Sequence, residues 1–224
     1  MARPWETLDA ATTPHGRLEL RRRDAREFLI TIDGRVLMNS AASLSEVALG
    51  RLACAAIADR VAPRVLIGGL GMACTLRACL DALPARAQVV VAELNEVVMR
   101  WCCDGPLADL TDRAALDPRV ELRVGDVAAA IAEAARPGGE RFDAVILDLY
   151  EGPVPGTPRD HPHYGEAALD LAHAALRRGG ILALWSEDPN AAFEKHLARA
   201  DFRVRSERPG HGGRRHVVYL GKRR

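Results

Sequence analysis

The chain has 224 residues, 48% of them hydrophobic, which is enough for one sizeable domain with a packed core. Its 31 basic and 30 acidic residues give a net charge of +1, so no global field favours nucleic acid or an anionic membrane surface as a partner. No run of about 18 apolar residues and no signal-peptide core occurs, and we therefore expect a cytoplasmic protein.

The cysteines indicate a reducing compartment. They are an odd set without CxxC spacing, and no histidines lie at metal-ligand distances from them. They are Cys54, Cys74, Cys79, Cys102 and Cys103. We expect free thiols and no metal site.

The first 42 residues are predicted to form an N-terminal tail and a small β unit. Residues 17–38 alternate apolar and polar side chains on both sides of Asp33-Gly34. Asp-Gly between two such runs is typical of a β-hairpin. We therefore expect two or three short antiparallel strands in this region.

Residues 43–224 are predicted to form the main domain, which begins with a serine-capped helix over residues 43–60. Strands and helices then alternate. Strands are expected at residues 64–69, 88–94, 119–126, 142–149 and 181–187, and helices at residues 72–83, 95–103, 127–135, 165–180 and 191–200. This alternation predicts an α/β fold with a Rossmann-like, doubly wound, mostly parallel sheet and helices on both faces.

The end of the chain distinguishes between classes of this fold. Two further strands are expected at residues 201–207 and 214–221, joined by a short glycine-rich loop. So short a loop makes an antiparallel hairpin, because a parallel crossover needs a dozen or more residues. A seven-stranded sheet closed by such a hairpin is the layout of class I S-adenosylmethionine-dependent transferases, whereas nicotinamide-dependent dehydrogenases usually continue with further strand-helix units.

Gly69 and Gly71 form a GxG in the turn between the first parallel strand and its helix. In a doubly wound sheet this turn lies where nucleotides bind, and glycine lets the backbone approach the ligand. Cys74 stands at the third position of the dinucleotide fingerprint, where glycine or alanine is expected, so pyrophosphate binding is a poor match. A lone GxG is also compatible with a turn that needs glycine only for its geometry.

Two carboxylates follow at the ends of the next two strands. Glu93 could accept hydrogen bonds from both ribose hydroxyls of a nucleoside, or could merely favour the start of the following helix. Asp126 is a natural helix N-cap, and its carboxylate could also accept the exocyclic amine of adenine. Together with the glycine turn, the two residues favour a nucleoside site.

The segment FDAVILDLYEGPVPG, residues 142–156, is predicted to be a buried strand that leads into Asp148, Tyr150 and Glu151. Carboxylates at this point lie across the topological switch from the glycine turn. They could hold a substrate ammonium and act as a base toward it, since a nucleophilic amine must lose its proton before attack. The alternative is a solvated loop that two prolines make rigid. Residues 159–165, RDHPHYG, could form a lid or an ordinary polar loop.

In this order and spacing, RVLIGGLGMACTLR, VVVAELNEVV, RVGD and FDAVILDLYEGP resemble the spermidine synthase family of aminopropyltransferases. Members of that family have a small N-terminal β domain and a Rossmann-like domain, bind decarboxylated S-adenosylmethionine and commonly dimerise. The resemblance implies ribose binding for Glu93, adenine recognition for Asp126, and handling of the attacking amine for Asp148 and Glu151. It also implies a possible homodimer.

The sequence departs from the family pattern near the reacting groups. The family's GGGDGG is GLGMAC here, so Met72 replaces the aspartate that contacts the aminopropyl ammonium of the donor. The segment after Gly34 lacks the family's glutamine and Tyr-x-Glu elements, and Gly152 replaces a proline. These departures leave ordinary S-adenosylmethionine open as the co-substrate.

We therefore expect a spermidine synthase-like transferase that uses S-adenosylmethionine or its decarboxylated form to alkylate a small amine with an aminopropyl or methyl group. Asp148 would position or deprotonate the acceptor, with Glu151 and Tyr150 beside it. A non-catalytic nucleoside-binding or scaffold protein that retains the fold is the alternative. A nicotinamide-dependent oxidoreductase is less favoured because of Cys74 and the terminal hairpin.

Overall fold

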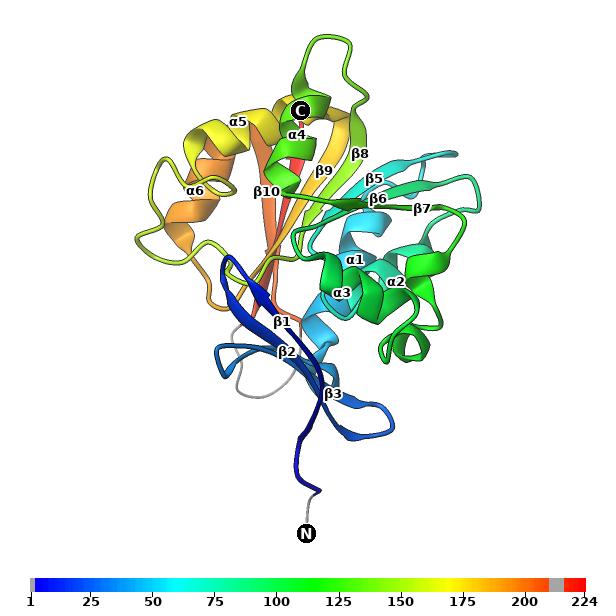
Figure 1. Cartoon of the computed structure of the whole chain (residues 1–224). Coiled ribbons are helices and arrows are strands. Elements are labelled where there is room, and N and C mark those ends of the chain that lie inside the picture. The colour runs from blue at the N-terminus through cyan, green and yellow to red at the C-terminus, as the bar shows by residue number, and fades with distance from the viewer. Residues whose placement is uncertain (1–2, 210–215) are drawn as a thin grey trace.

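Two β-sheets dominate the computed structural model of the chain, which describes residues 3–209 and 216–224 (Figure 1). The N-terminal sheet contains β1 (Glu6–Thr13), β2 (Gly16–Asp24), β3 (Glu27–Ile32) and β4 (Arg35–Asn39). The larger sheet contains β5 (Arg64–Gly68), β6 (Gln88–Glu93), β7 (Val120–Val124), β8 (Phe142–Leu147), β9 (Leu176–Ser186), β10 (Phe202–Glu207) and β11 (Val217–Arg223). The helices are α1 (Leu44–Ala55), α2 (Cys74–Ala82), α3 (Glu96–Cys103), α4 (Val127–Ala135), α5 (Glu166–Ala175) and α6 (Ala191–Arg199).

The larger sheet has the strand order β10-β11-β9-β8-β5-β6-β7. Strands β5 to β9 pair in parallel, whereas β11 pairs antiparallel with both β9 and β10. Helices α1, α2 and α3 pack on one face, and α4, α5 and α6 pack on the other (Figure 1). Because helices cover both faces, all six residues of β8 are buried. The predicted Rossmann-like α/β fold with a C-terminal antiparallel hairpin is confirmed.

The predicted loop of that hairpin is only partly described. Residues 210–215, which include the expected first two residues of the last strand, lie outside the described residues. The described part of the last strand begins at Val217 and pairs with β10 from Val218 onward.

The N-terminal sheet is an antiparallel meander of four strands. The predicted Asp-Gly turn is confirmed, since Asp33 and Gly34 join β3 to β4 with positive φ angles of 46° and 79°. Strand β1 was not predicted and lies in the stretch expected as a tail. Most of its side chains are exposed, so its sequence lacks the apolar alternation that identifies a strand, and pairing with β2 holds it in place.

The prediction of one helix over residues 165–180 is wrong at its C-terminal end. Helix α5 ends before Leu176, where β9 begins. Leu176 pairs with Phe142 of β8 and is fully buried, so burial against the sheet outweighs the helical spacing of the sequence. The pairing then shifts at a bulge that contains Gly179, with a φ angle of 73°; the glycine therefore shapes an irregular strand and does not stop a helix.

Helix α1 is also shorter than predicted. The apolar pattern extends to residue 60, but the helix ends at Ala55 and the chain turns toward β5. Ser43 occupies the predicted N-cap position, but its side chain makes no capping hydrogen bond.

The N-terminal sheet packs against the edge of the larger sheet where β5 and β6 end (Figure 1). Asp9 of β1 accepts a hydrogen bond of 2.7 Å from Nε1 of Trp101 in α3. Met38 of β4 lies directly against Gly71 in the turn after β5. The N-terminal sheet therefore covers one side of this edge of the larger sheet.

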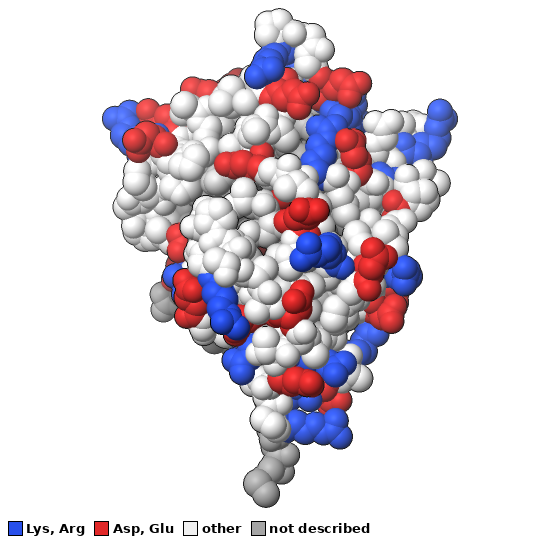
Figure 2. Space-filling view, viewed as in Figure 1, with Lys and Arg blue, Asp and Glu red and all other residues white. Residues whose placement is uncertain are grey.

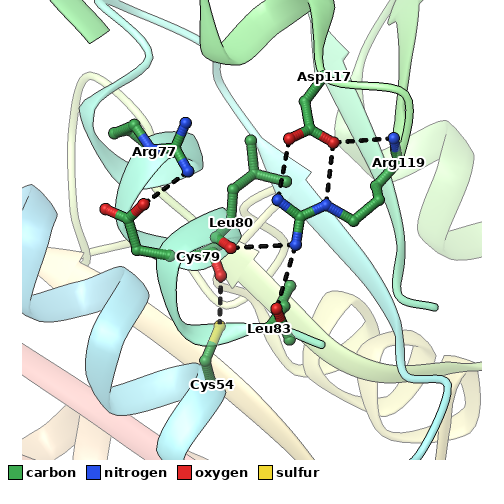
Figure 3. A network of polar contacts seen from close by, with 8 residues as sticks. Cys54, Arg77, Cys79, Leu80, Leu83, Asp117 and Arg119 are labelled. Atoms are coloured by element: carbon green, nitrogen blue, oxygen red, sulfur yellow. Dashed lines mark hydrogen bonds and ion pairs between the residues drawn. The ribbon is translucent and has the colours of Figure 1, made fainter. Parts of the chain in front are cut away.

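A network of hydrogen bonds holds the C-terminal end of α2 (Figure 3). Arg119 donates to the carbonyl oxygens of Leu80 and Leu83 at 3.0 and 3.1 Å, which satisfies acceptors at the C-terminus of the helix. Asp117 orients the guanidinium with two hydrogen bonds of 2.9 Å, and this contact lowers the pKa of Asp117 to about 2. With its C-terminus held, α2 presents its N-terminus at the carboxyl edge of the sheet.

Charge is mixed over the surface. On the face in Figure 2, positive and negative side chains are interspersed, in keeping with the net charge of +1. Within the described residues, no helix has the length and apolar character needed to cross a membrane.

Candidate active site

The four predicted motifs follow β5, β6, β7 and β8, and these strands are neighbours in the sheet. Because parallel strands end at the same edge, the structure brings the motifs together there. The turn after β5 touches the segment after β8. Gly69 has a φ angle of 84°, and a Cβ at this position would collide with the carbonyl oxygen of Asp148. Asp148 N–H in turn donates to the carbonyl of Gly68 at 2.9 Å.

The second glycine of the turn meets the N-terminal sheet. Gly71 has a φ angle of 51°, and a Cβ would collide with the sulfur of Met38. The next residue, Met72, is 0% exposed and belongs to the core beneath the turn. Met72 stands where the pattern of the spermidine synthase family has an aspartate. In this structure its side chain packs in the core.

Glu93 is 6% exposed and ties the turn to the end of β6. Its Oε2 accepts the N–H of Leu70 at 2.9 Å, and its Oε1 accepts the N–H of Asn95 at 2.9 Å. Two carboxylate oxygens offer about four acceptor positions, so capacity for ribose hydroxyls is left. Glu93 therefore also supports the start of α3, because Asn95 is the N-cap of that helix. This was the alternative role predicted for Glu93.

Asp126 is the predicted N-cap of α4, and its carboxylate accepts a 2.9 Å hydrogen bond from the N–H of Ala128. Its Oδ1 also lies 2.9 Å from Nε2 of His163, which belongs to the segment before α5. The contact with His163 and the cap together lower the pKa of Asp126, against the opposing effect of burial.

Asp148 lies between the turn, α1 and α2. Oγ1 of Thr75 is 2.5 Å from Oδ2 of Asp148. Burial raises the pKa of Asp148 to about 7, and the carboxylate of Glu46 in α1 adds to the rise, while the hydrogen bond from Thr75 opposes it. Asp148 can therefore exchange a proton near neutral pH.

Tyr150 and Glu151 lie farther out. The Glu151 side chain is 62% exposed and pairs with Arg35 at 3.2 Å. The guanidinium of Arg35 also lies 4.6 Å from the centre of the Tyr150 ring. The two predicted partners of Asp148 thus contact the first residue of β4. The backbone carbonyl of Glu151 accepts a 2.7 Å hydrogen bond from the hydroxyl of Tyr164.

Sequence reasoning missed several residues of this edge. Leu94 and Val124 are exposed apolar side chains beside Glu93 at the ends of β6 and β7, and their position next to predicted ligands was the available signal. Glu46 and Thr75 had no local signal, because their contacts with Asp148 join residues far apart in the sequence.

A cavity of about 480 Å³ lies at the opposite edge of the sheet. Two arginines in its lining are already paired, Arg64 with Glu140 at 3.0 Å and Arg177 with Asp143 at 2.7 Å. None of the predicted motifs reaches it, so it is not the candidate active site.

Among the described residues, no group of three or more His, Cys, Asp or Glu side chains is arranged to hold a metal ion. The five cysteines are free thiols. Burial raises the pKa of Cys74 to about 12, and this thiol beside Asp148 is therefore neutral near pH 7.

Comparisons with known proteins give a match at the level of structure. A scan of family models and a search of curated proteins found nothing that matches this sequence. A spermidine synthase from Thermotoga maritima is similar with a TM-score of 0.74 and 16% identity, over 96% of this chain and 72% of that one. A spermidine synthase in complex with the transition state analogue AdoDATO is similar with a TM-score of 0.73 and 17% identity, over 96% and 73% of the two chains. The chain therefore has the fold of the spermidine synthases.

Proposed function

We propose that the chain is a transferase that binds S-adenosylmethionine or its decarboxylated form and transfers an aminopropyl or methyl group to a small amine. The observation that carries the proposal is the Asp148 carboxyl, which follows β8 beside the glycine turn and has its pKa raised to about 7. The shared fold with spermidine synthases, one of them in complex with AdoDATO, supports this direction.

The nucleoside half of the proposal assigns roles along the edge. Glu93 would accept the ribose hydroxyls, and Asp126 the exocyclic amine of adenine. Leu94 and Val124 are exposed between them and would pack against the adenine ring. Gly69 and Gly71 let the backbone approach the donor.

The catalytic half rests on Asp148. An ammonium acceptor gives its proton to the ionised carboxylate, and the nitrogen lone pair then attacks the carbon bonded to the sulfonium sulfur. The carbon–sulfur bond breaks, and the sulfur leaves as a neutral thioether that needs no proton. A base with a pKa near the working pH suits the first step. Alignment of nitrogen, carbon and sulfur contributes the rest of the rate acceleration.

The test is to incubate the protein with each donor and a panel of small amines, and to read the products by mass spectrometry. A mass increase of about 57 daltons identifies aminopropyl transfer and one of about 14 daltons methyl transfer. Asp148→Asn should retain donor binding and lose turnover, since an amide is not a base at neutral pH. Calorimetry that detects no binding of either donor or of methylthioadenosine would contradict the proposal.

A nucleoside-binding protein without transfer activity is the second candidate. It is favoured by the contact of Glu151 with Arg35, which engages one of the two predicted acceptor carboxylates. It predicts calorimetric binding of methylthioadenosine and no product with any amine in the panel.

We also propose, from the family resemblance, that two chains form a homodimer and, from the net charge of +1, that no nucleic acid partner is involved. Light scattering coupled to gel filtration tests the dimer. A mass near twice 24.3 kDa is expected, and a mass near that of one chain would contradict it.

A further inference from the structure

Thr75 lies in the first turn of α2, between α1 and the segment after β8, and is 3% exposed. Its Oγ1 is 2.5 Å from Oδ2 of Asp148 and 3.1 Å from the backbone carbonyl oxygen of Glu46. The hydroxyl is thus placed between a carboxyl that can change its protonation state and a carbonyl that can only accept.

A threonine hydroxyl carries one proton and can also accept hydrogen bonds. When Asp148 is ionised, Thr75 donates to the carboxylate. When Asp148 is protonated, the acid donates to Oγ1, and the hydroxyl proton can turn to the carbonyl of Glu46. Both protonation states therefore have a hydrogen bond between the same two atoms, and a proton can arrive without releasing the Asp148 side chain.

We propose that Thr75 is the positioning residue of Asp148, and that its hydroxyl holds the carboxyl at the glycine turn in both protonation states. The part of this inference that concerns turnover depends on the proposed transferase function. The part that concerns the carboxyl itself depends only on the contacts of Thr75.

The surroundings of Asp148 make the Thr75 hydroxyl its main compensating partner. From α1, Glu46 faces it as a like charge and raises its pKa. From α2, Cys74 and Cys79 are neutral near pH 7, because burial raises the pKa of Cys74, and Cys54 together with burial raises that of Cys79.

Two further groups bear on Asp148 from other elements. Burial raises the pKa of Tyr164, with Asp148 adding to the rise, so this phenol is neutral. On the side of α1, the Ser45 hydroxyl donates to Oε2 of Glu46 at 2.7 Å and lies 3.0 Å from Nδ1 of His216. His216 thus contacts Ser45, which in turn contacts Glu46.

The hydrogen bond from Thr75 to the ionised carboxylate is charge-assisted and stronger than the bond in the protonated state. Removal of the hydroxyl should therefore raise the pKa of Asp148. Thr75→Val removes the hydroxyl at nearly constant shape, whereas Thr75→Ser keeps it and serves as the matched control.

The experiment is a carbon-13 NMR titration of the aspartate carboxyls in the full chain, with Asp148→Asn identifying the signal of Asp148. Thr75→Val should move the pKa of Asp148 upward by about one unit, a tenfold change in proton affinity, and Thr75→Ser should leave it near the wild-type value. The same pKa in the valine variant and the wild type, or an equal shift in the serine variant, overturns the inference. Should the valine variant not fold, Thr75→Ala is titrated in its place with the same expected shift.

Where turnover is found, the acidic limb of the kcat/KM profile reports the same group, because only the ionised carboxylate acts as a base. The limb should move to higher pH in Thr75→Val and stay in Thr75→Ser. An unchanged limb in the valine variant overturns the positioning role in catalysis. Absence of turnover in the wild type contradicts the transferase proposal alone, since the NMR titration still decides the role of Thr75.

Discussion

His163 Nε2 lies 2.9 Å from Oδ1 of Asp126, so the segment before α5 reaches the carboxylate at the end of β7. The same oxygen accepts the N–H of Ala128 and caps α4. Oδ2 takes part in neither contact, and it belongs to a side chain that is 47% exposed. Oδ1 therefore caps the helix, whereas Oδ2 is the oxygen that we expect to accept a hydrogen bond from a ligand. A mutation can separate these two roles.

Asp126→Asn should keep the cap and weaken nucleoside binding. Asparagine and aspartate cap helices about equally well, so the melting temperature should stay within a few degrees of the wild-type value. Loss of the charge should weaken binding of methylthioadenosine about tenfold, or about 1.4 kcal/mol. Calorimetry and thermal unfolding check the two effects, and unchanged affinity would remove the adenine assignment.

Glu93→Gln should reduce stability as well as affinity. Both carboxylate oxygens accept backbone N–H groups, those of Leu70 and Asn95, and a glutamine must turn its NH2 toward one of them. A buried donor without a partner costs about 1–3 kcal/mol. Urea unfolding measures this loss, and wild-type stability in the variant would mean that the two hydrogen bonds do not hold the turn.

Gly69→Ala should be far more damaging than Gly71→Ala, although both residues have positive φ angles. At Gly71 the Cβ meets the flexible side chain of Met38, so the expected cost is the backbone strain of about 1–2 kcal/mol plus a small rearrangement. At Gly69 the Cβ meets the backbone carbonyl of Asp148, which cannot move without shifting the segment after β8. Urea unfolding of the two variants compares the costs, and equal losses would contradict this explanation.

Arg35→Ala should strengthen the binding of a cationic acceptor and leave stability within about 1 kcal/mol, because Arg35 and Glu151 form an exposed pair. Removing the guanidinium frees the Glu151 carboxylate for a substrate ammonium, so KM for the amine should fall. Arg23→Ala is the matched control, since Arg23 pairs with Glu27 and lies 4.8 Å from the centre of the Trp5 ring. A higher KM in Arg35→Ala, or the same fall in the control, would count against this role of Glu151.

The raised pKa of Asp148 should appear in the pH dependence of stability. The folded state holds the proton up to about pH 7, whereas the unfolded chain releases it near the usual value of 3.8. The folded state binds more protons between these values, so the contribution of Asp148 is fully present below pH 3.8 and is lost as the pH rises toward 7. Asp148→Asn imitates the protonated acid, and it should gain stability relative to the wild type over this range, by up to about 4 kcal/mol. Urea unfolding between pH 4 and pH 8 checks the trend, and a constant difference would contradict the raised pKa.

The order of strands and helices could be predicted because the central strands are continuous apolar runs separated by helical spacing, as in β8 and α4. The glycine turn and the carboxylates at strand ends could be placed for the same reason. Where burial competes with local pattern, prediction failed. Leu176 continues the helical spacing of α5 but belongs to β9. Strand β1 is held by backbone pairing with β2, which its mostly exposed side chains do not indicate.

The candidate site was predictable only as far as strand ends determine it. Asp148 was placed correctly beside the turn, but the orientation of Glu151 toward Arg35 depends on how the N-terminal sheet packs, which no local pattern encodes. Thr75 and Glu46 lie on different helices, and their relation to Asp148 arises only when the helices cover the sheet.

The contact between Met38 and Gly71 couples the N-terminal sheet directly to the glycine turn. A ligand that orders the turn should then slow the opening of β4, although β4 lies in a different sheet. Amide hydrogen exchange in residues 35–39 should therefore slow when a ligand occupies the turn. A protease that cuts in this strand should likewise act more slowly on the ligand-bound protein.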